Sequence, residues 1–335
     1  MTTPLNSDRY ASMPYRRCGS SGLLLPAISL GLWQGTGSYV DMELSKQIIF
    51  TALNAGITHF DLANNYGSPA GSSETLFGKI LKELPRNEVV VATKAGYRMP
   101  TWPGPYGDGG SRKYLIQSCE ESLQRLGLDH VDIFYHHRID PNTPIEESMG
   151  ALETLVQQGK ALYVGVSNYA DPHFTRALGI MKEHQWSPLT IHQPRYNMLD
   201  REMETAVLPT AGRAGVGVIA FSVLAQGILT GKYNDGVPAD SRVALEMGNG
   251  AINAARLTPD KLLRVKQLDA IATARGQTLA QMALAWVLRD SRVTSALTGA
   301  SRPQQVLDSV RALENLAFSP EELEKIEAIL QDKTT

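Results

Sequence analysis

The sequence predicts an α/β fold, a (β/α)8 TIM barrel that forms a single domain over residues 1–335 with its core at about residues 15–330. Three observations lead to this prediction. Eight short apolar runs recur along the chain, segments with helical periodicity separate them, and no Gly-x-Gly-x-x-Gly motif follows the first run. Alternating strands and helices favour parallel β/α units, and eight such units suit a closed barrel better than an open dinucleotide-binding sheet.

The strands are predicted first, because each apolar run is four to eight residues long and rich in β-branched or aromatic residues. In order along the chain, they are Ala27–Gly31, Thr58–Ala63, Val89–Gly96, Val131–His137, Leu162–Asn168, Thr190–Pro194, Gly217–Ser222 and Thr294–Gly299. Apolar residues spaced at three and four positions predict helices between them. The clearest of these helices are Ser45–Asn54, Tyr114–Leu126, Ile145–Gln157 and Leu279–Leu288.

Helix starts and long loops complete the predicted layout. Thr143-Pro144 and Ser319-Pro320 are each followed by a Glu three residues after the hydroxyl residue, which predicts a capping box at both places. Two loops rich in Gly and Pro, Arg98–Gly110 and Tyr233–Gly250, follow predicted strands. We therefore expect both loops at the carboxyl end of the barrel, where active sites are built.

Composition limits the class of protein. The net charge is −2 and the 32 Lys and Arg residues are dispersed, so we expect no nucleic-acid partner. No apolar run approaches the ~20 residues of a membrane span, and Met1–Arg17 contains no apolar stretch of the signal-peptide type. These features predict a cytoplasmic protein without a membrane partner. Cys18 and Cys119 form no CxxC pair and are interpreted as small buried hydrophobes.

Four polar residues occupy the predicted carboxyl ends of three successive strands. Asp61 closes the second strand and Tyr66 follows it. Lys94 closes the third strand, and His137 closes the fourth. Because these strand ends meet on one rim of a barrel, we expect the four side chains to converge there as catalytic groups.

These residue types suit the reduction of a carbonyl group. Hydride addition builds negative charge on the carbonyl oxygen, so a proton donor must stand beside it, and Tyr66 is the predicted donor. A Lys94 ammonium nearby would stabilise the phenolate and lower the pKa of Tyr66. Asp61 would hold Lys94 in place and keep it charged, while His137 would orient the carbonyl oxygen.

Each of these residues could also have an ordinary structural role. An Asp at a strand end often caps a helix, a Lys there is usually solvated, and a lone Tyr is often a packing residue. His136 and His137 are adjacent, but no His-x-His or ligand cluster accompanies them, so we expect no metal site. The joint placement on three neighbouring strands is what favours catalysis.

The sequence resembles the aldo-keto reductases from about Tyr15 to Leu330. Within that family it resembles the bacterial L-glyceraldehyde 3-phosphate reductases, which are related to the β subunits of voltage-gated potassium channels. The segments that carry the resemblance are Gly56–Asp61, Asn64–Gly67, Thr93–Gly96, Trp102–Gly107, Gly165–Asn168, His192–Pro194, Leu224–Tyr233 and Gly299–Arg302. The resemblance implies a catalytic tetrad of Asp61, Tyr66, Lys94 and His137.

The resemblance also implies NADPH as the cofactor. Ser167, Asn168 and Gln193 match positions that bind the nicotinamide carboxamide, and Phe221 matches the residue that stacks on the ring. The full set of matching cofactor positions is Trp33, Asp61, Ser167, Asn168, Gln193, Phe221, Ser222, Leu224, Gln226, Gly227, Lys232, Arg242, Gly299, Ser301, Gln305 and Asp308. The family often has Glu-Asn at the adenine, where this chain has Asp308-Ser309.

Three functions are weighed from these observations. The leading hypothesis is reduction of small aldehydes such as glyceraldehyde 3-phosphate or methylglyoxal, with the cations Arg98, Arg112, Lys113 and Arg138 near the predicted mouth as candidate phosphate ligands. The alternative is a regulatory subunit that binds NADPH as a redox sensor. Channel β subunits typically have Asn where this chain has His137, which favours turnover. A metal-dependent hydrolase lacks its ligand cluster. The resemblance also leaves a homo-oligomer open.

Overall fold

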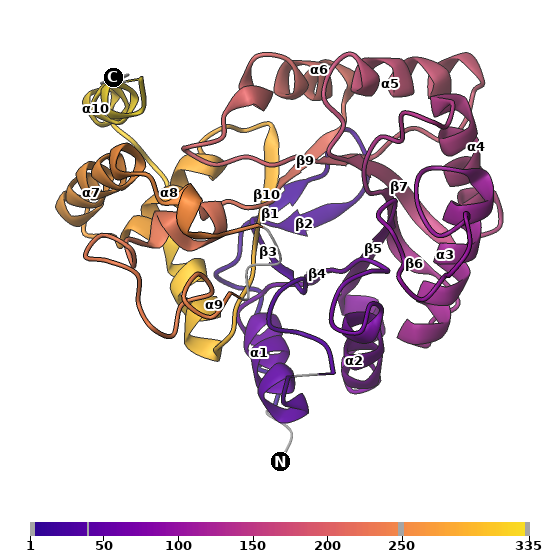
Figure 1. Cartoon of the computed structure of the whole chain (residues 1–335), viewed down its shortest axis with the longest axis horizontal. Coiled ribbons are helices and arrows are strands. Elements are labelled where there is room, and N and C mark those ends of the chain that lie inside the picture. Colours follow the sequence, from indigo (N-terminus) through magenta and orange to yellow (C-terminus); the bar gives the residue numbers. More distant parts are fainter. Residues whose placement is uncertain (1–3, 39, 247–250, 332–335) are drawn as a thin grey trace.

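Eight parallel strands close into a barrel in the order β10-β3-β4-β5-β6-β7-β8-β9, in a computed structural model that describes residues 4–38, 40–246 and 251–331 (Figure 1). The predicted strands are all present and their ends differ by at most two residues, so the predicted fold class is confirmed. The barrel strands are β3 (Ile28–Gly31), β4 (His59–Asp61), β5 (Val90–Ala95), β6 (Val131–His136), β7 (Ala161–Ser167), β8 (Ile191–Gln193), β9 (Gly217–Ala220) and β10 (Val293–Thr298).

Helices surround this barrel, and α7 and α10 lie at one edge of the ring (Figure 1). The α-helices are α1 (Met42–Asn54), α2 (Ser72–Leu81), α3 (Arg112–Leu126), α4 (Ile145–Gln157), α5 (His173–Glu183), α6 (Val207–Ala214), α7 (Pro259–Ala274), α8 (Leu279–Leu288), α9 (Pro303–Val310) and α10 (Pro320–Gln331). Short 3-10 helices are η1 (Arg86–Glu88), η2 (Glu202–Glu204), η3 (Ala225–Thr230), η4 (Ala254–Arg256) and η5 (Arg311–Glu314). Among the described residues, no helix has the length and apolar character of a membrane span.

The two predicted capping boxes have different outcomes. At the start of α10, the Ser319 hydroxyl accepts from the Glu322 N–H at 3.2 Å, and the Glu322 carboxylate accepts from the Ser319 N–H at 2.7 Å, which confirms that box. The prediction at Thr143 is wrong, because Pro144 occupies the capping position of α4. The Thr143 hydroxyl instead donates to the Asp140 carboxylate at 2.6 Å. This hydroxyl therefore does not cap the helix.

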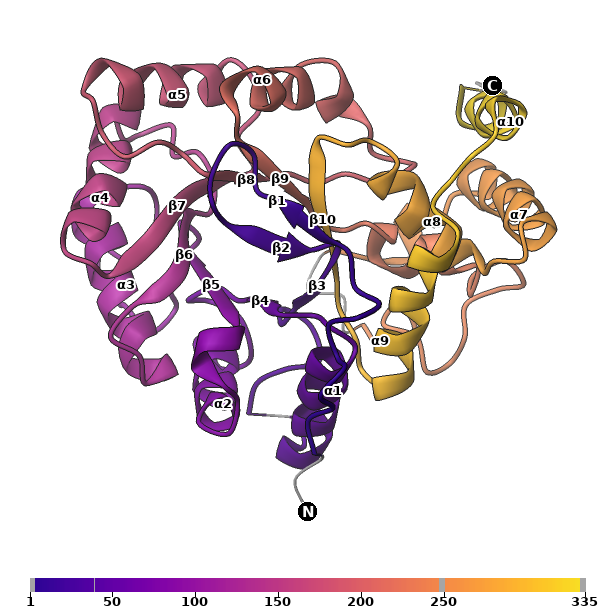
Figure 2. The ribbon, with the colours of Figure 1, turned by 180° about the vertical axis from the view of Figure 1, so that it is seen from behind.

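An antiparallel hairpin closes the amino end of the barrel. It consists of β1 (Tyr15–Arg17) and β2 (Leu24–Pro26), and Figure 2 shows it lying across the barrel opening. Its buried Cys18 and Leu25 pack against the inward-facing Ala92, Ile133, Tyr135, Ile191 and Ile219. Strands of three residues give no readable period, so the sequence did not predict this hairpin. Because the hairpin fills the amino end, functional groups must be built at the carboxyl end.

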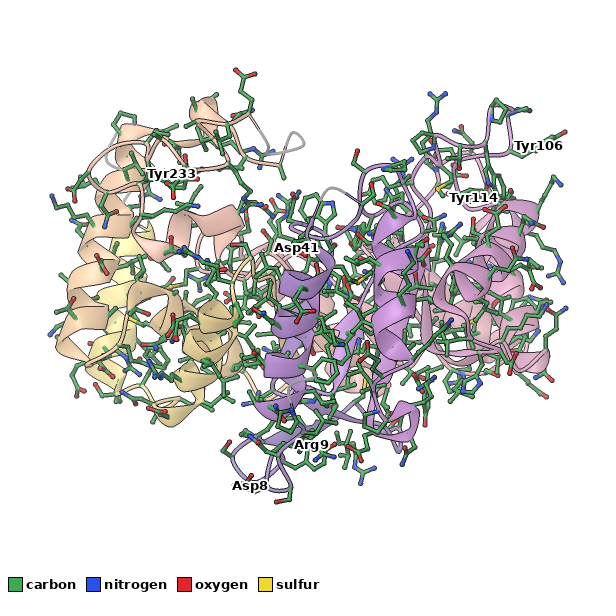
Figure 3. All side chains as sticks on the ribbon, turned by 90° about the horizontal axis from the view of Figure 1, so that it is seen from below. Asp8, Arg9, Asp41, Tyr106, Tyr114 and Tyr233 are labelled. Atoms are coloured by element: carbon green, nitrogen blue, oxygen red, sulfur yellow. The ribbon has the colours of Figure 1, made fainter. Side chains whose placement is uncertain are left out.

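The two long loops lie at one end of the molecule, as predicted. Figure 3 shows Tyr106 and Tyr233 on the same side of the barrel and Asp8 and Arg9 at the opposite end. Residues 247–250 of the second loop lie outside the described residues. The first loop is anchored, because the Trp102 indole donates to the Glu121 carboxylate at 3.1 Å. Both loops are therefore placed to border a site at the carboxyl ends of the strands.

Candidate active site

A buried ion pair forms the floor of the candidate site. The Lys94 ammonium donates to the Asp61 carboxylate at 2.5 Å and to the Leu62 carbonyl at 2.7 Å, and the two side chains are 0% and 1% exposed. Alternation along β4 and β5 turns both residues into the barrel, where their register places them on neighbouring strands. The second Asp61 oxygen accepts from the Gln193 amide at 2.9 Å. Both charges are thus paired and hydrogen-bonded, as burial requires.

Tyr66 and His137 lie over this pair. The Lys94 ammonium is 3.3 Å from the Tyr66 hydroxyl and 4.9 Å from the centre of the Tyr66 ring. The rings of Tyr66 and His137 are 5.8 Å apart between centroids and meet edge to face. The structure therefore brings the four residues of the predicted tetrad together at one rim of the barrel.

The charge states of these residues follow from their burial. Burial, followed by the Asp61 charge, raises the pKa of Tyr66 well above its ordinary value. The net shift is opposite to the lowering that the sequence suggested, because the loss of water on burial is its largest cause. Burial also lowers the pKa of Lys94, with Asp61 opposing that shift. Tyr66 therefore retains its proton at neutral pH and has one to donate.

The His137 imidazole is neutral. Burial and then the Lys94 charge lower its pKa well below the ordinary value. Its Nδ1 atom is buried and has no hydrogen-bond partner among the described residues. A neutral imidazole can donate one hydrogen bond and accept another, so His137 is suited to contact a carbonyl oxygen without carrying charge.

Two further residues near His137, Tyr97 and Asp108, were not predicted from the sequence. The Tyr97 ring packs edge to face against His137 with centroids 4.7 Å apart, and the Arg138 guanidinium lies 4.4 Å from the Tyr97 ring centre. Arg138 also pairs with the Asp108 carboxylate at 2.7 Å. Tyr97 stands three residues after Lys94, so the rule that catalytic groups follow strand ends would have included it. Asp108 has no such signal, because only the fold brings its loop to Arg138.

Three predicted carboxamide ligands are joined to the tetrad. The Ser167 hydroxyl donates to the Gln193 carbonyl at 2.8 Å, and the Asn168 amide donates to the His137 carbonyl at 3.0 Å. Asn168 has a left-handed backbone with φ of 55°. Such a conformation is uncommon outside glycine and is typical of constrained functional positions. Polar groups at the ends of β7 and β8 therefore face the same region as Asp61.

Two predicted aromatic residues border this region. The Trp33 and Tyr66 rings are 6.2 Å apart between centroids. The Phe221 N–H donates to the Pro194 carbonyl at 3.0 Å, which fixes Phe221 beside the end of β8. The Arg195 guanidinium lies 5.9 Å from the Phe221 ring centre. Arg195 is near one face of the Phe221 ring, so a flat ligand ring could stack on the other face.

The turn after β9 has an unusual backbone. Ser222, Ala225, Gln226 and Gly227 have positive φ values of 58°, 47°, 60° and 94°. The Leu224 carbonyl accepts from the Gly227 N–H at 2.9 Å within this turn. A turn in which right-handed and left-handed residues follow one another can point its backbone N–H groups at a bound anion. The predicted pyrophosphate-binding residues therefore form one continuous turn at the rim.

Two cations cover this turn. Arg242 donates to the Gln226 carbonyl at 2.7 Å and to its side-chain oxygen at 3.3 Å. A Cβ added at Gly227 would lie 3.2 Å from the Lys232 ammonium, which shows how close this cation lies to the backbone of the turn. A phosphate-rich group fits this combination of a glycine turn and two cations.

The predicted adenosine end is a separate cluster. Gln305 accepts from the Ser301 N–H at 2.7 Å and lies 3.1 Å from its hydroxyl. Gly299 directly follows β10, and a Cβ added there would lie 3.7 Å from the Gly31 carbonyl. The Asp308 carboxylate accepts from Gln304 at 2.9 Å and its side chain is 48% exposed, so Asp308 is engaged within α9. The structure therefore brings Ser301 and Gln305 together and leaves Asp308 on the outer surface.

No three His, Cys, Asp or Glu side chains gather as metal ligands among the described residues. His136, next to the tetrad, bonds the Tyr169 hydroxyl through Nδ1 at 2.6 Å. Burial lowers the pKa of His136 to about 4, so it is neutral at pH 7.

A parallel α/β barrel with a Tyr, a buried Lys–Asp pair and a His on one rim defines a class of oxidoreductase that acts on carbonyl groups. Residues 27–331 match the Aldo/keto reductase family, and the chain belongs to this family. It is 51% identical over 334 residues to the L-glyceraldehyde 3-phosphate reductase of Escherichia coli O157:H7, covering 98% of this chain and 95% of that protein. The resemblance stated from the sequence is therefore confirmed, and the chain is an oxidoreductase.

Channel-associated proteins are also among its relatives. The chain is 37% identical over 326 residues to a probable voltage-gated potassium channel subunit beta of Arabidopsis thaliana, with 96% of this chain and 98% of the relative covered. It is 39% identical over 331 residues to a putative subunit of this kind from Schizosaccharomyces pombe, with 95% and 94% covered. The family thus includes proteins named for catalysis and proteins named for channel association.

Proposed function

We propose that this protein reduces the carbonyl group of small aldehydes to an alcohol with NADPH, and that Tyr66 donates the proton. The observation that carries the proposal is the Lys94 ammonium, which lies 2.5 Å from Asp61 and 3.3 Å from the Tyr66 hydroxyl in a buried setting. A protonated phenol beside a fixed cation can neutralise an oxygen that becomes negative. When bound, NADPH supplies the hydride.

Each side chain of the tetrad has a separate role in the proposed reaction. The neutral His137 imidazole hydrogen-bonds the carbonyl oxygen and turns it toward Tyr66. The Tyr66 hydroxyl gives up its proton to that oxygen, and the Lys94 ammonium stabilises the phenolate left behind. Asp61 and the Leu62 carbonyl hold the ammonium so that it does not have to move as charge develops.

The cofactor would be held along the rim. Ser167, Asn168 and Gln193 would bind the carboxamide, and Phe221 would stack on the ring. The turn of Ser222, Leu224, Gln226 and Gly227 would contact the pyrophosphate with Lys232 and Arg242 above it, and Ser301 with Gln305 would take the adenosine end. We expect NADPH to bind more tightly than NADH, because Arg242, Ser301 and Lys232 would also meet the 2′-phosphate, which NADH lacks.

The Arg242→Ala variant should weaken NADPH binding by about tenfold or more, since one charge-assisted hydrogen bond contributes roughly 1.5–3 kcal/mol. NADH should lose much less, because it lacks the 2′-phosphate. Fluorescence titration of both cofactors measures the two dissociation constants, and Ser301→Ala is the matched variant at the adenosine end. Equal losses for both cofactors would assign Arg242 to the shared pyrophosphate turn, as its bonds to Gln226 also permit.

The substrates that we propose are short aldehydes, with glyceraldehyde 3-phosphate and methylglyoxal among the best. Support comes from the 51% identity to an L-glyceraldehyde 3-phosphate reductase and from cations beside the site. Arg138 lies over Tyr97, which packs on His137, and Arg98 is exposed in the neighbouring loop. The structure does not bring Arg112 to the mouth, because it donates to Gly150 and Thr154 on α4.

A comparison of glyceraldehyde with its 3-phosphate tests this proposal through the loss of NADPH absorbance. The wild type should have the higher kcat/KM for the phosphorylated aldehyde. Arg138→Ala or Arg98→Ala should lower the ratio of the two kcat/KM values by about tenfold. Arg112→Ala is the matched control, because its guanidinium is occupied at α4. An equal kcat/KM for both aldehydes in the wild type would make an uncharged aldehyde the better assignment.

The second candidate function is a regulatory subunit that binds NADPH and senses redox state. The 37% and 39% identities to probable and putative potassium-channel β subunits favour it. His137 completes the tetrad and favours turnover instead. NADPH binding without oxidation of NADPH by any small aldehyde would support the regulatory function over the reductase.

A further inference from the structure

We propose that a pocket beside the turn after β9 binds one phosphate group that does not belong to the cofactor. The pocket lies between the loop after β8, the turn after β9 and the segment from η4 to α7. We call it the phosphate pocket, and its polar lining consists of Arg195, Asp200, Ser222, Gln226, Arg256 and Lys261. Lys232 and Arg242, the cations assigned to the cofactor, do not line it.

The size of the pocket selects a small ligand. Its volume is about 70 Å3. Pockets for drug-sized ligands typically measure about 300–1,000 Å3, so this space suits a small group and not a whole nucleotide. The pocket therefore suits a single phosphate group.

The charge of the pocket selects an anion. Arg195, Arg256 and Lys261 stand against one carboxylate, Asp200, so the lining is net positive. Within the described ranges, none of these three cations forms an ion pair. The Lys261 ammonium donates to the Arg256 backbone carbonyl at 3.2 Å, which ties the start of α7 to η4. Two planar guanidinium groups and one ammonium can together bind the several oxygens of a phosphate and balance its double negative charge.

A rigid frame holds the lining in place. Asn197 is fully buried. Its amide donates to the Ser222 carbonyl at 3.0 Å and to the Asp200 carboxylate at 2.9 Å, and its side-chain oxygen accepts from the Asp200 N–H at 2.9 Å. Asn197 thus ties the loop after β8 to the turn after β9 and also engages the one acidic group of the pocket. Arg195, two residues earlier, is carried on this same frame.

The backbone of the turn adds a second feature. Ser222, Ala225 and Gln226 line the pocket, and all three have left-handed φ values, between 47° and 60°. Left-handed backbone is strained outside glycine, and such strain is often found where a ligand is bound. Arg242 and Lys232, the cations assigned to the cofactor, lie near Gln226 and Gly227. The three cations of the phosphate pocket share its lining with Ser222 and Gln226. One turn is therefore supplied with two separate sets of cations.

Calorimetric titration with inorganic phosphate tests the proposal, on protein saturated with NADPH and at constant ionic strength. The wild type should bind phosphate, and the Arg256→Gln/Lys261→Gln double variant should bind it at least tenfold more weakly, because two charged hydrogen-bond donors are lost. Lys266→Gln is the matched control, since Lys266 is an exposed cation of the same helix outside the pocket. NADPH affinity should be unchanged in all these variants.

Three results would overturn the proposal: no phosphate binding by the wild type, displacement of phosphate by NADPH, or an equal loss in the Lys266→Gln control. The same titration on protein without cofactor keeps the test separate from the proposed reductase function. Methyl phosphate serves as a second probe. Tighter binding of methyl phosphate than of phosphate would identify a phosphate ester as the occupant, and the reverse order would identify free phosphate.

Discussion

The Tyr66→Phe variant is expected to lower kcat by at least ~100-fold, a typical scale for the loss of a general acid. The substitution removes one hydroxyl and retains the ring that packs against Trp33 and His137. The dissociation constant for NADPH should therefore remain within about threefold of wild type. Single-turnover kinetics and cofactor titration on the same preparation measure the two quantities.

The pH profile provides an independent check on this role. Burial raises the pKa of Tyr66, so its phenol stays protonated through the neutral range. Reduction requires the protonated form, and the rate should therefore not decline between about pH 6 and pH 8 and should fall only at higher pH. Wild-type kcat in the Phe variant would remove Tyr66 from the mechanism, and Tyr97 would become the next phenol to examine.

The barrel could be predicted from the sequence because its strands are buried on both faces over most of their length. Such strands appear as short apolar runs, as in Val131–His136, and their order along the chain fixes the order around the barrel. The tetrad could be predicted for a related reason. Asp61, Lys94 and His137 stand at strand ends, so a prediction of the strands is also a prediction of the rim on which they lie.

Features that depend on contacts between distant segments could not be predicted in this way. The β1–β2 hairpin is held by Cys18 and Leu25 against buried residues from four other strands, and nothing in the local sequence marks it. The start of α4 depends on Asp140, which competes for the Thr143 hydroxyl. The raised pKa of Tyr66 depends on how much water the fold excludes, which a list of charged neighbours does not contain.

The Lys94→Met variant is expected to lose both activity and stability. Met fills much of the space but leaves the Asp61 carboxylate buried with Gln193 as its remaining side-chain partner. Removing one member of a buried pair typically costs 3–5 kcal/mol, so the free energy of unfolding should fall by about that amount. Tyr66 would also lose the cation that stabilises its phenolate. Urea denaturation and NADPH oxidation measure the two effects.

The Asp61→Asn/Lys94→Met double variant separates these effects. It removes both charges, and the Asn amide can still hydrogen-bond Gln193, so most of the lost stability should return. Activity should not return, because catalysis needs the ammonium and not merely a neutral core. A double variant that regains turnover would show that Lys94 acts only as a partner for Asp61. A single Lys94→Met variant with wild-type stability would show that the Asp61 charge is relieved in some other way, and the buried ion pair would then not stabilise the fold.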